Sequence, residues 1–430
     1  MSRRRFPLLG YPAYVRFWLA DAVSMVGSAV TVLALQTVAA LTLGATNTEL
    51  GLLQSARWLP YLLFGLIVGV YVDRRRRQPL LIGTDFARAL VLVLIPLSAE
   101  FDLLSLPLLL VIVFVFGALS LVYDAAHQSF PPSLVPAPLL TSAYARLEQS
   151  SAVAQTGGPV LAGALVKLLG GPLAILIDAA SYLVSGILLA TVRPLHPEVA
   201  PSIDQPRNLR REIRDGLAWV YRNSTLGPLA LTSHLWFFFQ GAFTAVYVNY
   251  VLKTLDMSAF LFGVTYALSG IGSVVGATAS GWVGRRLGVG PAIIAAGWLT
   301  PAAYLLIPLA GGDTTGLVLL CAGQFLFGLS IGIDSPIEMG YRQSITPSAL
   351  LGRMNATMRS VNRAAIVIGA PVGGLIADFF GPHWALWFVA VGMAVKSVLL
   401  QRSEFRHARL PDEAPPDNDR DGVKNRPSEE

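Results

Sequence analysis

Long apolar runs recur along the whole chain, and they limit its possible folds more than any other feature. Each run is about 20 residues long, which is the length of helix needed to cross a hydrocarbon core of about 30 Å. Only 13% of the 430 residues are charged, about half the share found in a typical soluble domain. A water-soluble fold of this size would lack polar surface, so we predict an all-α integral membrane protein.

We expect about twelve membrane-spanning helices in two sets of six. The first set is predicted at 15–43, 49–72, 79–99, 103–126, 142–169 and 172–192. The second set is predicted at 226–251, 258–283, 289–310, 315–338, 354–379 and 383–400. The chain then divides into an N-terminal half (1–192), a linker (193–225), a C-terminal half (226–402) and a tail (403–430).

The linker contains apolar residues at helical spacing, namely Leu209, Ile213, Leu217 and Val220, with arginines between them. This pattern predicts an amphipathic helix that lies along the inner membrane surface and joins the two halves. The tail is rich in Pro, Asp, Glu and Arg, so we expect it to be disordered and cytoplasmic.

Basic residues fall almost entirely on one side of the predicted spans. If the N-terminus is cytoplasmic, the outer loops hold only Lys167 and Lys253 of the 32 lysines and arginines. The positive-inside rule therefore predicts cytoplasmic termini and an even number of spans. The membrane is expected to be the plasma membrane.

A weak internal repeat relates the two halves. Adding 212 to a position converts Gly69 to Gly281 and Pro159 to Pro371. Parallel repeats of this kind build transporters whose halves rock about a site at their interface. The repeat predicts two pseudo-symmetric six-helix halves.

The end of the second predicted span carries a Gly-x-x-x-Asp-Arg-x-x-Arg pattern, formed by Gly69, Asp73, Arg74 and Arg77. It resembles the signature loop of the major facilitator superfamily, although Gln78 stands where a base is usual. The resemblance implies a twelve-helix transporter fold and a conformational latch at the inner face made by these residues. The alternative is a basic loop that only determines topology.

The fifth predicted span contains Ala154-x-x-x-Gly158-Pro159-x-x-Ala162-Gly163, which resembles the antiporter motif of the same superfamily. A Gly-Pro pair bends a helix and frees a backbone carbonyl, and the alternative is a simple packing kink. The phrases around Asp85 to Arg88, Asp178 and Glu212 resemble the macrolide-efflux-like drug–proton antiporters, a branch that also contains siderophore exporters. These resemblances favour efflux.

Ionisable and polar side chains inside predicted spans are costly and usually face a cavity. We expect a proton-coupling or substrate cavity formed by Asp21, Arg57, Glu148, Gln155, Asp178, His234 and Gln324. Asp21 begins a polar stripe with Ser24, Ser28 and Thr31 on the first span. Our hypothesis is that Asp21 or Glu148 carries the coupling proton; otherwise each is an interfacial cap or a member of an ion pair.

Two acids end the tenth predicted span, Asp334 and Glu338, and two arginines begin the eleventh, Arg359 and Arg363. Each pair repeats at about one helical turn and lies at the same inner depth. We expect gating ion pairs between them, rather than passive pairing at the inner face.

Together these features predict a secondary transporter that exports a small amphiphilic molecule, such as a drug, an antibiotic or a siderophore, in exchange for protons. Alternatives of the same fold are an importer and a lysophospholipid flippase. A membrane-embedded enzyme is disfavoured, because the five histidines are too scattered to suggest a catalytic site. No phosphate-binding loop occurs in the sequence, and we expect no cofactor, metal or nucleic acid, and a monomer.

Overall fold

The computed structural model describes residues 7–195 and 209–409, apart from a few side chains, that of Asp73 among them. The first half contains α1 (Pro12–Thr37), α2 (Asn47–Asp73), α3 (Arg77–Glu100), α4 (Leu106–Ser129), α5 (Leu140–Leu169) and α6 (Gly171–Ala190). The second contains α8 (Leu226–Asn249), α9 (Ala259–Leu287), α10 (Val289–Leu306), α11 (Thr314–Ile345), α12 (Ser348–Phe380) and α13 (Pro382–Arg402). The described residues contain no strand, so the all-α prediction is confirmed.

Eleven helices of the described part are long and apolar enough to cross a membrane. The remaining long helix, α2, has 27 residues, which gives a length of about 40 Å at 1.5 Å per residue. It packs within the same bundle, against α4 of its own half and α12 of the other. This agrees with the expected set of about twelve spans.

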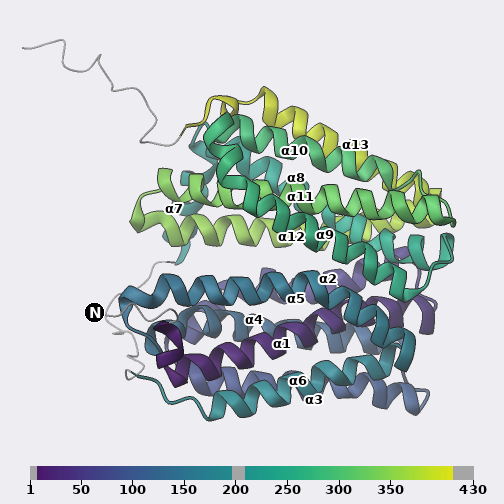
Figure 1. The fold of residues 1–430 in the computed structure, drawn as a ribbon, viewed down its shortest axis with the longest axis horizontal. Helices are drawn as coiled ribbons and strands as arrows, with labels where there is room; N and C mark the ends of the chain where they lie inside the picture. The colour runs from purple at the N-terminus through teal and green to yellow at the C-terminus, as the bar shows by residue number, and fades with distance from the viewer. Residues whose placement is uncertain (1–6, 196–208, 410–430) are drawn as a thin grey trace, which may run out of the picture.

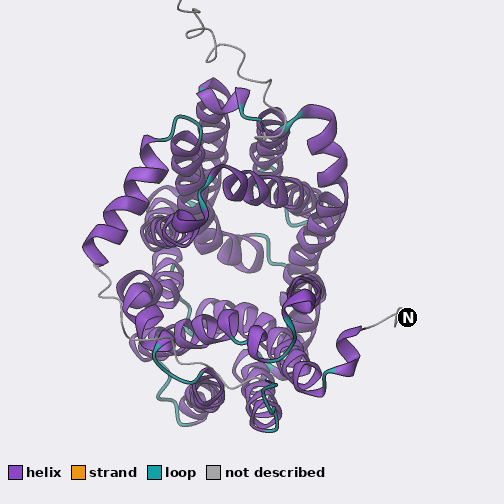
Figure 2. Ribbon diagram, turned by 90° about the vertical axis from the view of Figure 1, so that its left-hand side faces the viewer, coloured by secondary structure: helices purple, strands orange, loops and turns teal. Residues whose placement is uncertain are grey.

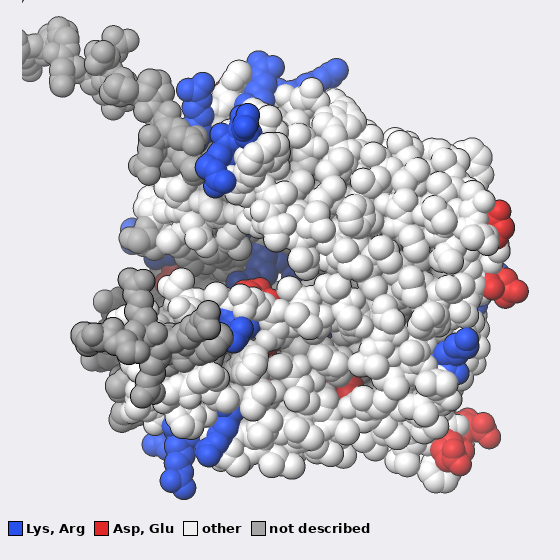
Figure 3. Space-filling view, viewed as in Figure 1, with Lys and Arg blue, Asp and Glu red and all other residues white. Residues whose placement is uncertain are grey.

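The two halves lie side by side, with α1–α6 below and α8–α13 above in Figure 1. Seen along the bundle, the helices of both halves are arranged around a common axis (Figure 2). We call the end of the bundle where α7 (Leu209–Arg222) lies the linker end, and the other the opposite end. In Figure 3 blue side chains gather toward the linker end and red ones toward the opposite end, which is the charge asymmetry seen in the sequence.

The 212-residue repeat reappears in the backbone. α1 ends in a π-helical turn, Val38–Thr42, and α8 ends in another, Tyr250–Thr254. Leu43 N–H donates to Val38 O at 3.0 Å, and Leu255 N–H donates to Tyr250 O at 2.9 Å. Gly44 (φ 68°) and Asp256 (φ 51°) then occupy the left-handed region at equivalent positions. The first helix of each half therefore ends in the same local backbone structure, a π-helical turn followed by a residue of positive φ.

Contacts between the halves run from the opposite end to the middle of the bundle. Near that end a Cβ added at Gly163 of α5 would lie 2.6 Å from the Ala259 carbonyl oxygen of α9. Nearer the middle, Ser55 Oγ of α2 donates to Val367 O of α12 at 2.8 Å. Toward the linker end, Figure 3 shows a hollow between the halves with charged side chains at its depth. The structure is therefore closed at the opposite end and open at the linker end.

The predicted amphipathic helix of the linker is α7, and it is docked on the C-terminal half. Gly216 packs closely against the Arg353 backbone of α12, and Arg353 Nη1 lies 3.2 Å from Asp215 Oδ2. Tyr221 OH lies 2.8 Å from His234 Nε2 of α8. These polar contacts attach α7 to the C-terminal half, so the helix is held by the protein itself and not only by the membrane surface.

Candidate functional site

A cavity of about 300 Å³ lies against the N-terminal half. It is lined by α1, α3, α4 and α5, through Asp21, Ser24, Met25, Ser28, Ala29, Val32, Arg88, Tyr123, Asp124, His127, Ser151, Ala154 and Gln155. The polar stripe predicted on the first span therefore faces this cavity, which mixes carboxylates, hydroxyls and apolar side chains. Such a lining suits a small molecule with both polar and apolar parts.

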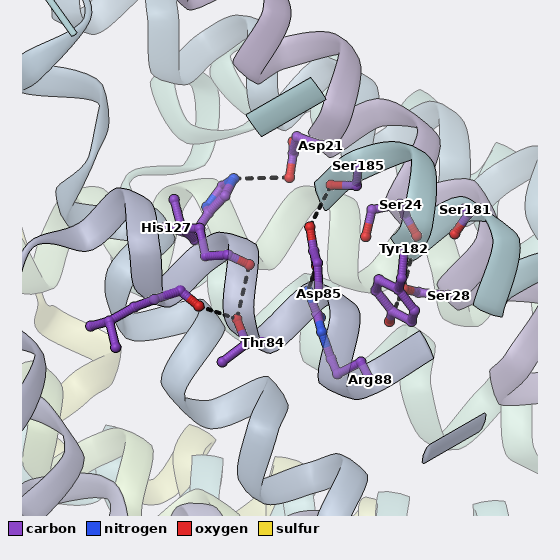
Figure 4. A network of polar contacts seen from close by, with 12 residues as sticks. Asp21, Ser24, Ser28, Thr84, Asp85, Arg88, His127, Ser181, Tyr182 and Ser185 are labelled. Atoms are coloured by element: carbon purple, nitrogen blue, oxygen red, sulfur yellow. Dashed lines mark hydrogen bonds and ion pairs between the residues drawn. The ribbon is translucent and has the colours of Figure 1, made fainter. Parts of the chain in front are cut away.

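Asp21 of α1 and His127 of α4 contact each other in the cavity wall, and they form an ion pair when the imidazole is protonated. His127 Nε2 lies 2.8 Å from Asp21 Oδ1, as Figure 4 shows. Asp21 is 3% exposed, and its second oxygen, Oδ2, is buried without a hydrogen-bond partner. Imidazole is the side chain that changes charge most readily near neutral pH, and a carboxylate in contact with it is a common proton-transfer partner. This pair can therefore hold a mobile proton at the cavity.

Arg88 of α3 is a buried cation inside the same half. It pairs with Asp85 one turn away, and Ser185 Oγ of α6 donates to the other oxygen of Asp85 at 2.7 Å. The guanidinium lies between two aromatic rings, 3.9 Å from the centroid of Tyr123 and 4.1 Å from that of Tyr182. Stacking on both faces and a carboxylate at the edge offset the cost of burying the charge.

The Tyr182 hydroxyl connects this buried group to the cavity, because it lies 2.8 Å from Ser28 Oγ. Figure 4 shows Arg88, Tyr182 and Ser28 close together, lower in the view than the Asp21–His127 pair. We call these residues, with Asp85 and Tyr123, the N-half network. A change in charge at one residue of this network alters the electrostatic energy of the others, because the surrounding interior has a low dielectric constant.

A second carboxylate of the cavity, Asp124, reaches toward the C-terminal half. Tyr61 OH of α2 donates to Asp124 Oδ2 at 2.6 Å. Beside it, the Arg363 guanidinium of α12 lies 3.7 Å from the centroid of Trp58. The stack crosses between the halves, so motion of one half against the other must change it.

The sequence-predicted cavity residues of the first half divide into three groups. Asp21 and Gln155 line the cavity. Asp178 is fully buried on α6, where its carboxylate accepts a hydrogen bond from Ser181 Oγ at 2.9 Å. The Arg57 guanidinium carbon lies 5.4 Å from the centroid of the Trp58 ring. Glu148 is exposed on α5, two turns nearer the linker end than Gln155.

The predicted residues of the second half lie away from that cavity wall. His234 Nδ1 is 2.6 Å from Asn362 Oδ1, so the imidazole bridges α7 and α12. Gln324 is 1% exposed, with its Nε2 buried and unpartnered. It belongs to an aromatic region in which Tyr247 OH donates to Thr265 Oγ1 at 2.9 Å.

The four predicted gating residues are not paired with one another in this conformation. Glu338 Oε1 instead lies 2.7 Å from Arg342 Nη1 on the same helix. Asp334 has a buried oxygen without a hydrogen-bond partner, Arg359 is exposed, and Arg363 stacks on Trp58. A gating role for these residues thus depends on another conformation.

The signature-loop motif lies where α2 ends and α3 begins. Gly69 and Asp73 lie at the linker end of α2, and Arg74 caps the helix, with Arg77 at the start of α3. The Asp73 side chain lies outside the described residues, so the predicted latch stays a prediction.

Gly158 and Pro159 lie within α5. A Cβ added at Gly158 would come within 2.4 Å of the Ala29 Cβ of α1, so the glycine is needed for close packing. Proline has no N–H, and the Gln155 carbonyl at the cavity therefore lacks the helical hydrogen bond from position 159.

Sequence reasoning did not select four residues of this site: Arg88, Tyr123, Asp124 and His127. The available signal was ionisable side chains inside long apolar runs, with Asp85 and Arg88 three apart. Among the described residues, no group of three His, Cys, Asp or Glu side chains is arranged to hold a metal ion.

Two six-helix halves, one of them lining a cavity of mixed polarity, define a membrane transporter of the major facilitator type. The chain belongs to the transmembrane secretion effector family, whose model matches residues 6–422. The resemblance seen in the signature loop is thereby confirmed, and the chain is a transporter and not an enzyme.

Curated relatives include efflux proteins. The chain is 24% identical over 402 residues to macrolide efflux protein A of Streptococcus pyogenes, covering 92% of this chain and 97% of that protein. It is 26% identical over 360 residues to the enterobactin exporter EntS of Citrobacter koseri, covering 82% and 83% respectively.

Solved transporters share the fold at low sequence identity. A mutant of the nucleoside transporter NupG aligns with a TM-score of 0.77 at 10% identity, covering 90% of this chain and 99% of that one. A bacterial homologue of the iron transporter ferroportin, in its inward-facing state, aligns with a TM-score of 0.71 at 16% identity, covering 90% and 97%.

Proposed function

We propose that this transporter exports a small amphiphilic molecule, such as a drug, an antibiotic or a siderophore-like compound, in exchange for protons. The observation that carries the proposal is the Asp21–His127 pair, a carboxylate and an imidazole in contact in the wall of a cavity lined by the N-terminal half. The efflux proteins among its relatives support the direction of transport.

The coupling proton is proposed to reside on Asp21 and not on Glu148. Asp21 lies in the cavity wall beside His127, whereas Glu148 is exposed on α5 and is not one of the residues that line the cavity. A proton on Asp21 removes the charge that attracts the imidazolium, so binding of the proton and binding of a cationic or polar substrate compete at one place. Competition for a shared site is sufficient for exchange when the halves alternate.

We further propose that the linker end faces the cytoplasm, that both termini are cytoplasmic and that the chain acts as a monomer in the plasma membrane. Most described arginines lie at the linker end, which supports this orientation by the positive-inside rule. The open hollow at that end then admits substrate from the cytoplasm, as an exporter requires.

The test is transport into inverted membrane vesicles with an imposed pH gradient. With the interior acidic, export activity should appear as substrate accumulation that collapses when the gradient is dissipated. Macrolides and a catecholate siderophore are suitable first probes. Accumulation only in right-side-out vesicles would favour an importer, and movement of a lysophospholipid probe alone would favour a flippase.

A further inference from the structure

One carboxylate of the C-terminal half holds the first turn of a helix in the N-terminal half. Asp378 of α12 accepts from Asn47 N at 3.0 Å and from Asn47 Nδ2 at 2.8 Å through Oδ1. Its Oδ2 accepts from Thr48 N at 2.9 Å and from Thr48 Oγ1 at 2.6 Å. All four hydrogen bonds cross between the halves at the opposite end.

The acceptor is well matched to this position. The first N–H groups of a helix have no partner within the helix, and the positive end of the helix dipole favours a negative charge there. Thr46 and Glu49 already form a capping box at the start of α2. Asp378 satisfies the two N–H groups that this box leaves, those of Asn47 and Thr48.

The surrounding backbone is built for close approach. A Cβ added at Gly374 of α12 would lie 2.4 Å from the Asn47 carbonyl oxygen. The neighbouring Ala45 carbonyl accepts from Asn249 Nδ2 at 3.1 Å and from Lys253 Nζ at 2.9 Å, both in the second half. Residues 45–48 are thus held by three separate polar side chains of the other half.

The equivalent seam between α5 and α9 lacks this arrangement. There the start of α9 is capped by its own Ser258, whose Oγ accepts from Leu261 N at 3.3 Å. The halves meet instead through small residues, with Gly263 packed on the Pro159 carbonyl. One seam therefore carries a charged contact that can be made or broken, and the other carries only packing.

We propose that Asp378 is the gate residue of the opposite end, and that its contact with the start of α2 sets how often that end opens. The proposal rests on the alternating access of the proposed function. Opening the opposite end requires α12 and α2 to separate there, and all four hydrogen bonds must then be exchanged for water. Asp378 acts as a positioning residue that favours the conformation described here.

The test measures the populations of the two conformations by spin-label distances in the full-length protein. Cys321→Ser provides the background. One label pair at Glu100 and Thr315 reports the opposite end, and a second pair at Gln128 and Ser344 reports the linker end. In Asp378→Asn the amide presents a donor to groups that are themselves donors. We expect the long-distance population at the opposite end to rise about tenfold while the linker-end distance shortens.

Two further variants make the result interpretable. Asp313→Asn alters a carboxylate at the same end that caps α11 of its own half, at 2.8 Å from Gly316 N, and should leave both distances unchanged. Gly374→Ala wedges α12 from α2 without changing charge and should shift populations in the same direction as Asp378→Asn. Unchanged distances in both Asp378→Asn and Gly374→Ala would overturn the proposal.

These distances need neither substrate nor a proton gradient. A failure of transport in vesicles would therefore count against the proposed function and leave the gate result standing. The reverse outcome, transport with an unaltered gate in both variants, would reject the gate and leave the function.

Discussion

The two halves share a fold but differ in what they bury. The N-terminal half encloses an ion pair and a stacked guanidinium around Asp21, Asp85 and Arg88. The C-terminal half buries Lys396, which is 5% exposed, and it also contains an aromatic cluster in which Phe243 lies near Tyr247 and Tyr304 at centroid distances of 4.7 and 4.6 Å. The halves share a scaffold, but the charged side chains that line the cavity all belong to the N-terminal half.

This difference indicates a division of work. Buried charges are costly, so a half that gathers them around a cavity can respond to a change of charge there, whereas an aromatic cluster gains stability from packing alone. We infer that the N-terminal half responds to the proton and that the C-terminal half serves as the firm partner against which it moves.

The largest expected effect comes from removing the buried cation. Arg88→Ala leaves Asp85 as an unpaired charge and should destabilise the protein by about 3–5 kcal/mol, measured as a fall in its thermal unfolding temperature in detergent. Arg359→Ala, at an exposed arginine of the other half, is the matched control and should leave the unfolding temperature nearly unchanged. Equal destabilisation by both would remove the distinction between the halves.

The next effect concerns transport and not stability. Asp21→Asn keeps the shape of the side chain but prevents it from carrying a negative charge, so gradient-driven export should fall at least about tenfold with normal membrane insertion. Glu148→Gln is the control and should retain export. Full export in Asp21→Asn, or loss in Glu148→Gln alone, would transfer the coupling role away from the Asp21–His127 pair.

A smaller effect is expected in the aromatic half. Tyr304→Phe removes the hydroxyl that donates to Gln240 Oε1 and leaves that oxygen without the bond, at a cost of about 1–2 kcal/mol. Export should stay within about twofold of the original, because no proton exchange is assigned to this cluster. A loss of pH-dependent export comparable with that of Asp21→Asn would show that both halves take part in coupling.

The smallest effect should come from the linker helix. Tyr221→Phe removes the hydroxyl next to His234 Nε2 and should cost about 1 kcal/mol, seen as faster hydrogen exchange in α7 and little change in export. Unchanged exchange would mean that the Tyr221 hydroxyl does not hold the helix and that its other contacts, including the Asp215–Arg353 pair and the packing of Gly216, are sufficient.

Much of the architecture was predictable from the sequence, for physical reasons. Run lengths set the spans, because the bilayer fixes how many apolar residues a helix needs. The repeat was visible in Gly69 and Gly281, and the structure adds the matched π-helical turns that follow α1 and α8. A π-turn depends on local hydrogen bonding that no single residue type reports, so it could not be predicted.

The site was predictable only in part. Asp21 could be found because a polar stripe at helical spacing on one span points to one face. Its partner His127 lies 106 positions further along the chain, and no spacing rule joins residues of different helices. The expected pairs of Asp334 and Glu338 with Arg359 and Arg363 stay a prediction for another conformation, because here Glu338 pairs with Arg342 one turn away and Arg363 stacks on Trp58.

The central claim, that the Asp21–His127 pair carries the transported proton, can be tested most directly by recording proton movement on substrate addition. In inverted vesicles without an imposed gradient, adding substrate to the original protein should move protons out of the lumen, detected with an internal pH dye. Asp21→Asn should bind substrate and move no protons. Proton movement equal to the original in Asp21→Asn would contradict the account.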